Sequence, residues 1–194
     1  MKNLSLRDKT RKRIYFLTLT AILTALCTVI TYFVSIPLPG GKGYLNLSDS
    51  IIMVTASIIN PFIGGIVGGV SGFLSDVFLG YGASYAPFTV FIKFIEGLVA
   101  GFAYLGIKKL FKGKFYQLNV LTYIISGLLM AVMYMIPDAI FFKDLIYIDL
   151  VGNIFQGLAG AGVGFYLLFI FRDNPYFYKE KFIKENNKLI SLTK

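Results

Sequence analysis

Two short rows of polar side chains interrupt apolar segments of this 194-residue chain. They comprise Thr89, Lys93 and Glu96 in one segment, and Asp149, Asn153 and Gln156 in another. Spacings of three and four residues place each row on one face of a helix. A charge inside a membrane is costly and marks a functional site by default. We therefore expect the two rows to face each other and to offer ion pairs and hydrogen bonds to a polar ligand.

The composition indicates that these segments lie in a membrane. Hydrophobic residues make up 56% of the chain, and its mean hydropathy is +0.71. The single cysteine, Cys27, excludes a disulfide framework. With no histidine, few ligands remain for zinc or haem, so we expect neither a metal site nor a cofactor.

Turn residues and charges divide the apolar sequence into six segments. They cover residues 14–36, 47–59, 62–79, 87–110, 118–136 and 145–171. The sequence therefore predicts an all-α integral membrane protein, a six-transmembrane-helix bundle over residues 14–171. A basic N-terminus, 1–13, precedes this domain and a basic tail, 172–194, follows it. The second segment is short for a hydrocarbon core of about 30 Å, which leaves a five-span reading open.

Positive charges cluster before the first segment, after the fourth and after the sixth. Such clusters stay on the cytoplasmic side, and with six spans all three fall on one side, so we expect both termini in the cytoplasm. Topology and contact with anionic lipid headgroups account for the net charge of +9. A polyanion bound by a basic terminus is the alternative; nucleic acid is not an expected partner.

This topology places both polar rows in the outer half of the membrane, within about 16 Å of the outer helix ends. Tyr44, Tyr81 and Tyr85 lie in the outer loops above them. Their rings suit stacking on a flat ligand, and they suit anchoring at the headgroups equally. We expect a substrate pocket that opens to the exterior and is built from the two rows and these tyrosines.

Structural roles are the alternative for the same groups. Lys93 and Glu96 could form an ion pair that only lowers the cost of insertion, and Asn153 and Gln156 could join helices. Three aspartates near the outer span ends suit helix capping or loop pairing as well as ligand contact. They are Asp49, Asp76 and Asp138.

Small residues recur at four-residue spacing in several segments and predict close helix packing. They are Gly64, Gly65, Gly68, Gly69 and Gly72, the pair Gly97/Gly101 and the pair Gly160/Gly164. Ala21 and Ala25 form a similar pair in the cytoplasmic half of the first segment. We expect these alanines to offer a flat face to the helix of another protein.

Residues 43–101 resemble the substrate-binding S components of energy-coupling factor (ECF) transporters. The motifs are NLSD at 46–49, Asn60-Pro61 followed by two glycine pairs, Asp76, Gly80-Tyr81, APFT at 86–89 and KFIEG at 93–97. The resemblance is strongest to the riboflavin-type branch, which also holds proteins assigned to hydroxymethylpyrimidine and pyridoxine. It implies a binding subunit in the bacterial cytoplasmic membrane, working with a transmembrane coupling subunit and two ATPases.

The resemblance also implies roles for individual residues. Ala21 and Ala25 would contact the coupling subunit, and the ligand would lie beneath the loop around Tyr44, against Lys93, Glu96, Asn153 and Gln156. A pyridoxine- or hydroxymethylpyrimidine-like ligand suits a compact polar site, with riboflavin or queuine as alternatives. The chain has no tryptophan or histidine, which argues against a thiamine-type pocket.

Two other classes of protein would use the same polar groups. A stand-alone secondary transporter or channel should carry inverted repeats, and no convincing internal repeat is present. An intramembrane enzyme could use Glu96 and Lys93 as acid and base, but no nucleophile and base stand at helical spacing. The chain also lacks GxxxxGK[ST], so it cannot hydrolyse ATP through that motif. We expect a binding subunit and not an enzyme.

Overall fold

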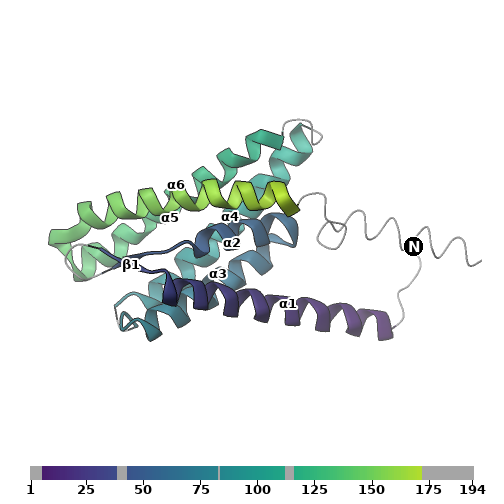
Figure 1. Cartoon of the computed structure of the whole chain (residues 1–194), viewed down its shortest axis with the longest axis horizontal. Helices are drawn as coiled ribbons and strands as arrows, with labels where there is room; N and C mark the ends of the chain where they lie inside the picture. The colour runs from purple at the N-terminus through teal and green to yellow at the C-terminus, as the bar shows by residue number, and fades with distance from the viewer. Residues whose placement is uncertain (1–5, 39–42, 83, 112–115, 172–194) are drawn as a thin grey trace, which may run out of the picture.

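The computed structural model describes residues 6–38, 43–82, 84–111 and 116–171, which form a bundle of helices (Figure 1). The α-helices of these residues are α1 (Leu6–Phe33), α2 (Ser48–Ile58), α3 (Pro61–Phe78), α4 (Ala86–Leu110), α5 (Asn119–Phe141) and α6 (Ile146–Phe171). Two 3-10 turns, η1 (Tyr116–Leu118) and η2 (Lys143–Leu145), precede α5 and α6. The predicted all-α membrane fold is thus confirmed, with one helix for each predicted segment.

Five of these helices are long and apolar enough to cross a membrane. The exception is α2, whose 11 residues extend over only about 16 Å. The start of α1 and the end of α6 lie at the same end of the bundle (Figure 1), as an even number of passes requires. Six full crossings and the cytoplasmic side of the termini stay predictions. The predicted tail, 172–194, lies outside the described residues.

The short helix α2 occupies the interior of the bundle. It contacts α3, α4 and α6, and nine of its 11 residues are buried. A two-stranded hairpin leads into it: β1 (Ile36–Pro37) pairs antiparallel with β2 (Tyr44–Leu45), and β2 contacts α6. The hairpin therefore delivers the polar first turn of α2 into the bundle at the end where α6 begins (Figure 1).

Glycines let the helix backbones touch, as their spacing predicts. A Cβ atom on Gly97 of α4 would lie 2.6 Å from the backbone of Gly64 in α3, and one on Gly127 of α5 would lie 2.7 Å from the Cα of Gly157 in α6. Approach this close replaces side-chain packing by direct backbone contact. The pairs α3–α4 and α5–α6 are consequently the most extensively packed helix pairs of the bundle.

Helix α5 is longer than the sequence predicted. The proline at 137 suggests an end at residue 136, but α5 continues to Phe141 with Pro137 inside it. A proline removes one helical hydrogen bond, and the turn after it still closes, because Phe142 N donates to the Asp138 carbonyl at 2.7 Å. The extra turn brings Asp138 inside the bundle, where it is buried.

Replacing Gly97 by alanine should destabilise the protein, since the added methyl would force α3 and α4 apart. We expect a cost of about 1–3 kcal/mol, the usual range for overpacking, seen as a lower Tm in detergent. Gly106 on the same helix is the matched control, because a Cβ there meets nothing within 4 Å. The proposed backbone contact would be refuted if Gly97→Ala and Gly106→Ala unfolded at the same temperature.

Candidate functional site

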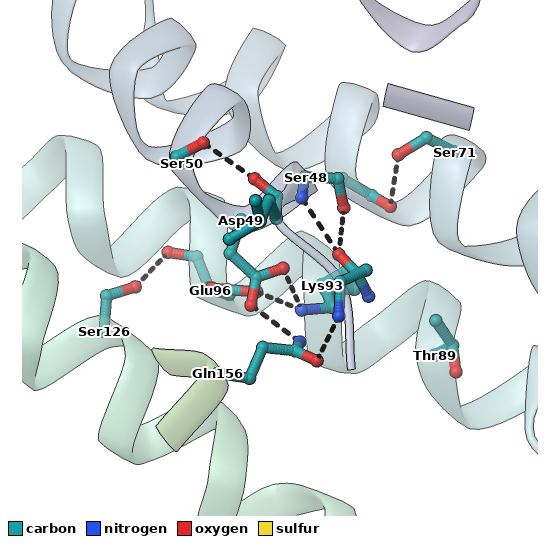
Figure 2. A network of polar contacts seen from close by, with 12 residues as sticks. Ser48, Asp49, Ser50, Ser71, Thr89, Lys93, Glu96, Ser126 and Gln156 are labelled. Atoms are coloured by element: carbon teal, nitrogen blue, oxygen red, sulfur yellow. Dashed lines mark hydrogen bonds and ion pairs between the residues drawn. The ribbon is translucent and has the colours of Figure 1, made fainter. Parts of the chain in front are cut away.

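Lys93 of α4 is the centre of a buried polar network (Figure 2). Its Nζ forms ion pairs with the carboxylate of Asp49, at the start of α2, and with Glu96 Oε2 at 3.0 Å. Lys93, Asp49 and Glu96 are exposed by only 3%, 0% and 1%. Burying an ammonium group is costly unless it is paired, so the two carboxylates allow the lysine to lie inside the membrane domain.

A second set of bonds fixes these groups. Gln156 Nε2 of α6 donates to Asp49 Oδ2 at 2.8 Å, and Gln156 Oε1 accepts from the backbone N–H of Asn46 at 2.9 Å. Asn46 Oδ1 in turn accepts from the N–H and the hydroxyl of Ser48, at 3.0 and 2.6 Å. The network thereby joins α2, α4 and α6 with Asn46, the residue that follows β2. Figure 2 shows Asp49, Lys93 and Gln156 converging in it.

Tyrosines and aspartates form a second layer above this network. Tyr44 donates to Asp76 Oδ1 at 2.7 Å; Tyr85 donates to Asp138 Oδ1 at 2.7 Å and approaches Asp149 Oδ2 at 3.5 Å. Burial raises the pKa of the Tyr44 phenol, and the nearby Asp76 carboxylate adds to this. Burial likewise raises the pKa of Tyr85, helped by its hydrogen bond to Asp138. Both phenols therefore remain protonated donors.

The aromatic rings in this layer touch one another. The Tyr44 and Tyr81 centroids are 5.4 Å apart, Tyr81 and Tyr85 6.3 Å, and Tyr85 stacks on Phe142 at 5.6 Å. Tyr134 of α5 lies below them, with its hydroxyl 3.2 Å from Thr89 Oγ1 and its ring centroid 5.9 Å from Lys93 Nζ. The rings form an aromatic wall of the kind on which a planar ligand can stack.

These side chains surround a cavity of about 40 Å³. Eight of the nine predicted substrate-binding residues line it: Tyr44, Tyr81, Tyr85, Thr89, Lys93, Asp149, Asn153 and Gln156. The ninth, Glu96, is not among the lining residues and contacts Lys93. Two polar rows 53 or more positions apart in the chain thus meet at one cavity, as their spacing predicts.

Sequence reasoning did not assign three of the aspartates at this site. Asp49 does not cap α2, which has no side-chain cap; it is the ion-pair partner of Lys93. Asp76 and Asp138 both line the cavity and accept from tyrosines. Tyr134 was missed as well, although its position four residues before Asp138 is a signal that both share a helix face.

The cavity is strongly acidic and rich in free acceptors. Among the described residues, three buried carboxylate oxygens of the lining have no hydrogen-bond partner: Asp76 Oδ2, Asp138 Oδ2 and Asp149 Oδ1. A fourth such oxygen, Glu96 Oε1, belongs to the partner of Lys93 and does not line the cavity. No group of three or more metal-ligating side chains occurs in the described part of the chain. The open carboxylate oxygens make the cavity suited to accepting hydrogen bonds from a ligand.

The predicted partner face lies away from this cavity, on α1. Ala21 and Ala25 are exposed, whereas Thr24, Cys27 and Thr28 turn inward. Helix α1 packs against α3 and, more weakly, against α2. It has the least buried of the five candidate spans, 17% against 33–50% for the others, so its outer face is open to lipid or to another protein.

Comparison with known proteins agrees with the earlier resemblance. The family model described as ECF-type riboflavin transporter, S component, matches residues 11–172. A Pyrococcus woesei protein described as "Uncharacterized protein in gap 3'region" is 33% identical over 145 residues, which cover 72% of this chain and 93% of that protein.

Replacing Lys93 by methionine should leave Asp49 and Glu96 buried without a counter-charge. We expect a loss of about 3–5 kcal/mol of stability, measured as a lower Tm in detergent, and partial recovery in the double variant Lys93→Met/Asp49→Asn. Lys109→Met, at an exposed position of α4, is the matched control and should unfold like the parent. A parent-like Tm for Lys93→Met would contradict the ion-pair assignment.

Proposed function

This chain belongs to the family of ECF-type riboflavin transporter S components, and we propose that it captures a small heteroaromatic vitamin or vitamin precursor in the cavity beside Lys93. The family assigns the chain to the substrate-binding membrane subunits of transporters. The single observation that carries the proposed site is the convergence of both polar rows and three tyrosines on one cavity.

The chemistry of the lining matches a flat heterocycle. Asn153 supplies an amide with both donors and acceptors for the edge of a ring, and it forms none of the hydrogen bonds described above. The tyrosine rings offer a stacking surface. Lys93 supplies a charged donor next to the cavity. In this arrangement Asn153 would bind the edge of the ligand ring, the tyrosines its face, and Lys93 a polar substituent.

Size favours a single-ring ligand. A cavity of about 40 Å³ holds about three water molecules, so any vitamin must displace side chains as it binds. A pyridoxine- or hydroxymethylpyrimidine-like compound requires a smaller displacement than riboflavin, which has three fused rings and a sugar-alcohol chain. Riboflavin is the second candidate because the family bears its name, and a queuine-type base is a third.

Uptake would depend on partner subunits. The chain lacks the ATP-binding motif GxxxxGK[ST], so an ECF coupling subunit and two ATPases would supply the energy. The exposed pair Ala21 and Ala25 on α1 would form the contact with the coupling subunit, since small residues let helices approach closely. In this proposal the protein resides in the cytoplasmic membrane, with the cavity toward the exterior.

Asn153→Ala should weaken vitamin binding at least about tenfold without lowering the Tm, because the side chain lines the cavity and takes no part in the hydrogen-bond network described above. The ligand is first identified by mass spectrometry of small molecules released from the denatured, detergent-purified protein, and affinity is then measured by calorimetry. Gln117→Ala, at an exposed site in η1, should bind like the parent. Equal affinities of the two variants would argue against this cavity as the binding site.

Ala21→Leu/Ala25→Leu should leave ligand binding intact and abolish uptake, because bulkier side chains would keep a partner helix from close approach. Uptake is measured in cells that also produce the coupling subunit and ATPases, and association by co-purification. Ala139→Leu/Ala159→Leu makes the same change at exposed positions of α5 and α6 and should transport normally. Uptake that persists without the partner subunits would instead indicate a stand-alone transporter.

A further inference from the structure

The pair of carboxylates Asp138 and Asp149, joined by the hydroxyl of Tyr85, is not explained by the packing of the helices. We infer that these two aspartates bind a cationic nitrogen of the ligand, an ammonium or protonated amino group. The inference rests on the proposed function, because it assigns a charge to the vitamin or precursor that the cavity binds.

Each of these two carboxylates keeps one oxygen without a hydrogen-bond donor among the described residues. Tyr85 has one proton, which it donates to Asp138 Oδ1 at 2.7 Å while Asp149 Oδ2 lies 3.5 Å away. The other oxygen of each carboxylate, Asp138 Oδ2 and Asp149 Oδ1, has no hydrogen-bond partner within the described structure. Both residues line the cavity and are exposed by only 1% and 2%. Buried acceptors without donors are costly, and a ligand bearing N–H groups would satisfy them.

The charge balance points the same way. At the cavity, Lys93 forms ion pairs with Asp49 and Glu96. That lysine already faces two carboxylates, so it leaves no positive charge to spare for Asp138 and Asp149. Two neighbouring carboxylates in a poorly hydrated site repel each other unless one of them holds a proton, and a cation from the ligand would allow both to be ionised.

The surroundings of the pair suit an organic cation better than a metal ion. Tyr85 stacks on Phe142 and contacts Tyr134, so aromatic rings flank the carboxylates. Aromatic faces attract organic ammonium groups, whereas Ca²⁺ takes six to eight oxygen ligands and Mg²⁺ near-ideal octahedral geometry. Clusters of three or more metal-ligating side chains do not occur among the described residues.

Spacing along α6 sets where the charge would sit on the ligand. Asp149 and Asn153 are four residues apart on the same buried face, a rise of about 6 Å. With its ring edge against Asn153, a single-ring ligand could reach Asp149 through a one-carbon substituent. An aminomethyl group on a pyridine or pyrimidine ring has this reach.

Matched pairs of compounds test the charge directly. Pyridoxamine carries an aminomethyl group where pyridoxine carries a hydroxymethyl group, and 4-amino-5-aminomethyl-2-methylpyrimidine differs from its 5-hydroxymethyl counterpart in the same way. Calorimetry on the full-length protein in detergent should show that, on at least one ring, the amine binds about thirtyfold tighter or more. Asp138→Asn/Asp149→Asn should abolish this preference, whereas Asp144→Asn, an exposed aspartate in η2, should preserve it.

The single variants Asp138→Asn and Asp149→Asn guard against loss of folding in the double variant, because each keeps one carboxylate and should lower the amine preference only in part. Lys42 lies outside the described residues, and its side chain is tested by Lys42→Gln. If only this variant, and not the parent, prefers the amine to the hydroxymethyl compound, Lys42 is the cation that pairs with Asp138 and Asp149, and the inference is overturned. Binding of hydroxymethyl compounds that requires Na⁺ or Mg²⁺, and loses this requirement in the double aspartate variant, would overturn it in favour of a metal ion.

The remaining outcomes separate the inference from the proposed function. If either hydroxymethyl compound or riboflavin binds tightly and neither amine binds better, the cationic-ligand inference fails while the vitamin-binding function stands. If the parent binds none of these compounds and releases no small molecule on denaturation, the proposed function fails and the inference fails with it.

Discussion

The structure depends on keeping one ammonium group inside a membrane domain. Lys93 is buried, and an unpaired charge at that depth would cost more than the small net stability of a folded protein allows. Its two carboxylate partners come from different places: Glu96 lies one turn away on α4, and Asp49 comes from α2. The second contact requires a polar helix start deep in the bundle, and the short, buried helix α2, which follows the hairpin, provides it.

Glycine backbones make that arrangement possible. A Cβ on Gly68 of α3 would lie 2.7 Å from the Lys93 carbonyl, and a Cβ on Gly160 of α6 would lie 3.0 Å from the Cβ of Asp49. Lys93 therefore packs against α3 and Asp49 against α6, each at a helix position without a side chain. In a membrane, where the hydrophobic effect does not drive helices together, such close packing and the polar bonds it permits supply the association energy.

Above the ion pair, the protein presents acceptors to the cavity. The tyrosines donate their single protons to aspartates and leave further carboxylate oxygens open. The network around Lys93 is held by ion pairs within the protein. The layer of tyrosines and aspartates keeps carboxylate oxygens that lack donors within the described structure. This division fits the binding subunit of a transporter. The ion pairs of Lys93 hold the helices together. The open carboxylate oxygens of the second layer are available to hydrogen-bond a ligand.

The sequence by itself determined the membrane class, the family, the number of helices and the two polar rows, because hydropathy and helical periodicity are local properties. Helix bounds followed within a few residues, except where α1 begins earlier, at Leu6, and α5 runs on past Pro137. Only the tertiary structure decided which groups meet. Asp49 pairs with Lys93 across 44 positions and with Gln156 across 107, and Tyr85 reaches Asp149 across 64. No local pattern encodes these contacts, since they depend on how closely glycine-faced helices pack and on the angle at which the hairpin inserts α2.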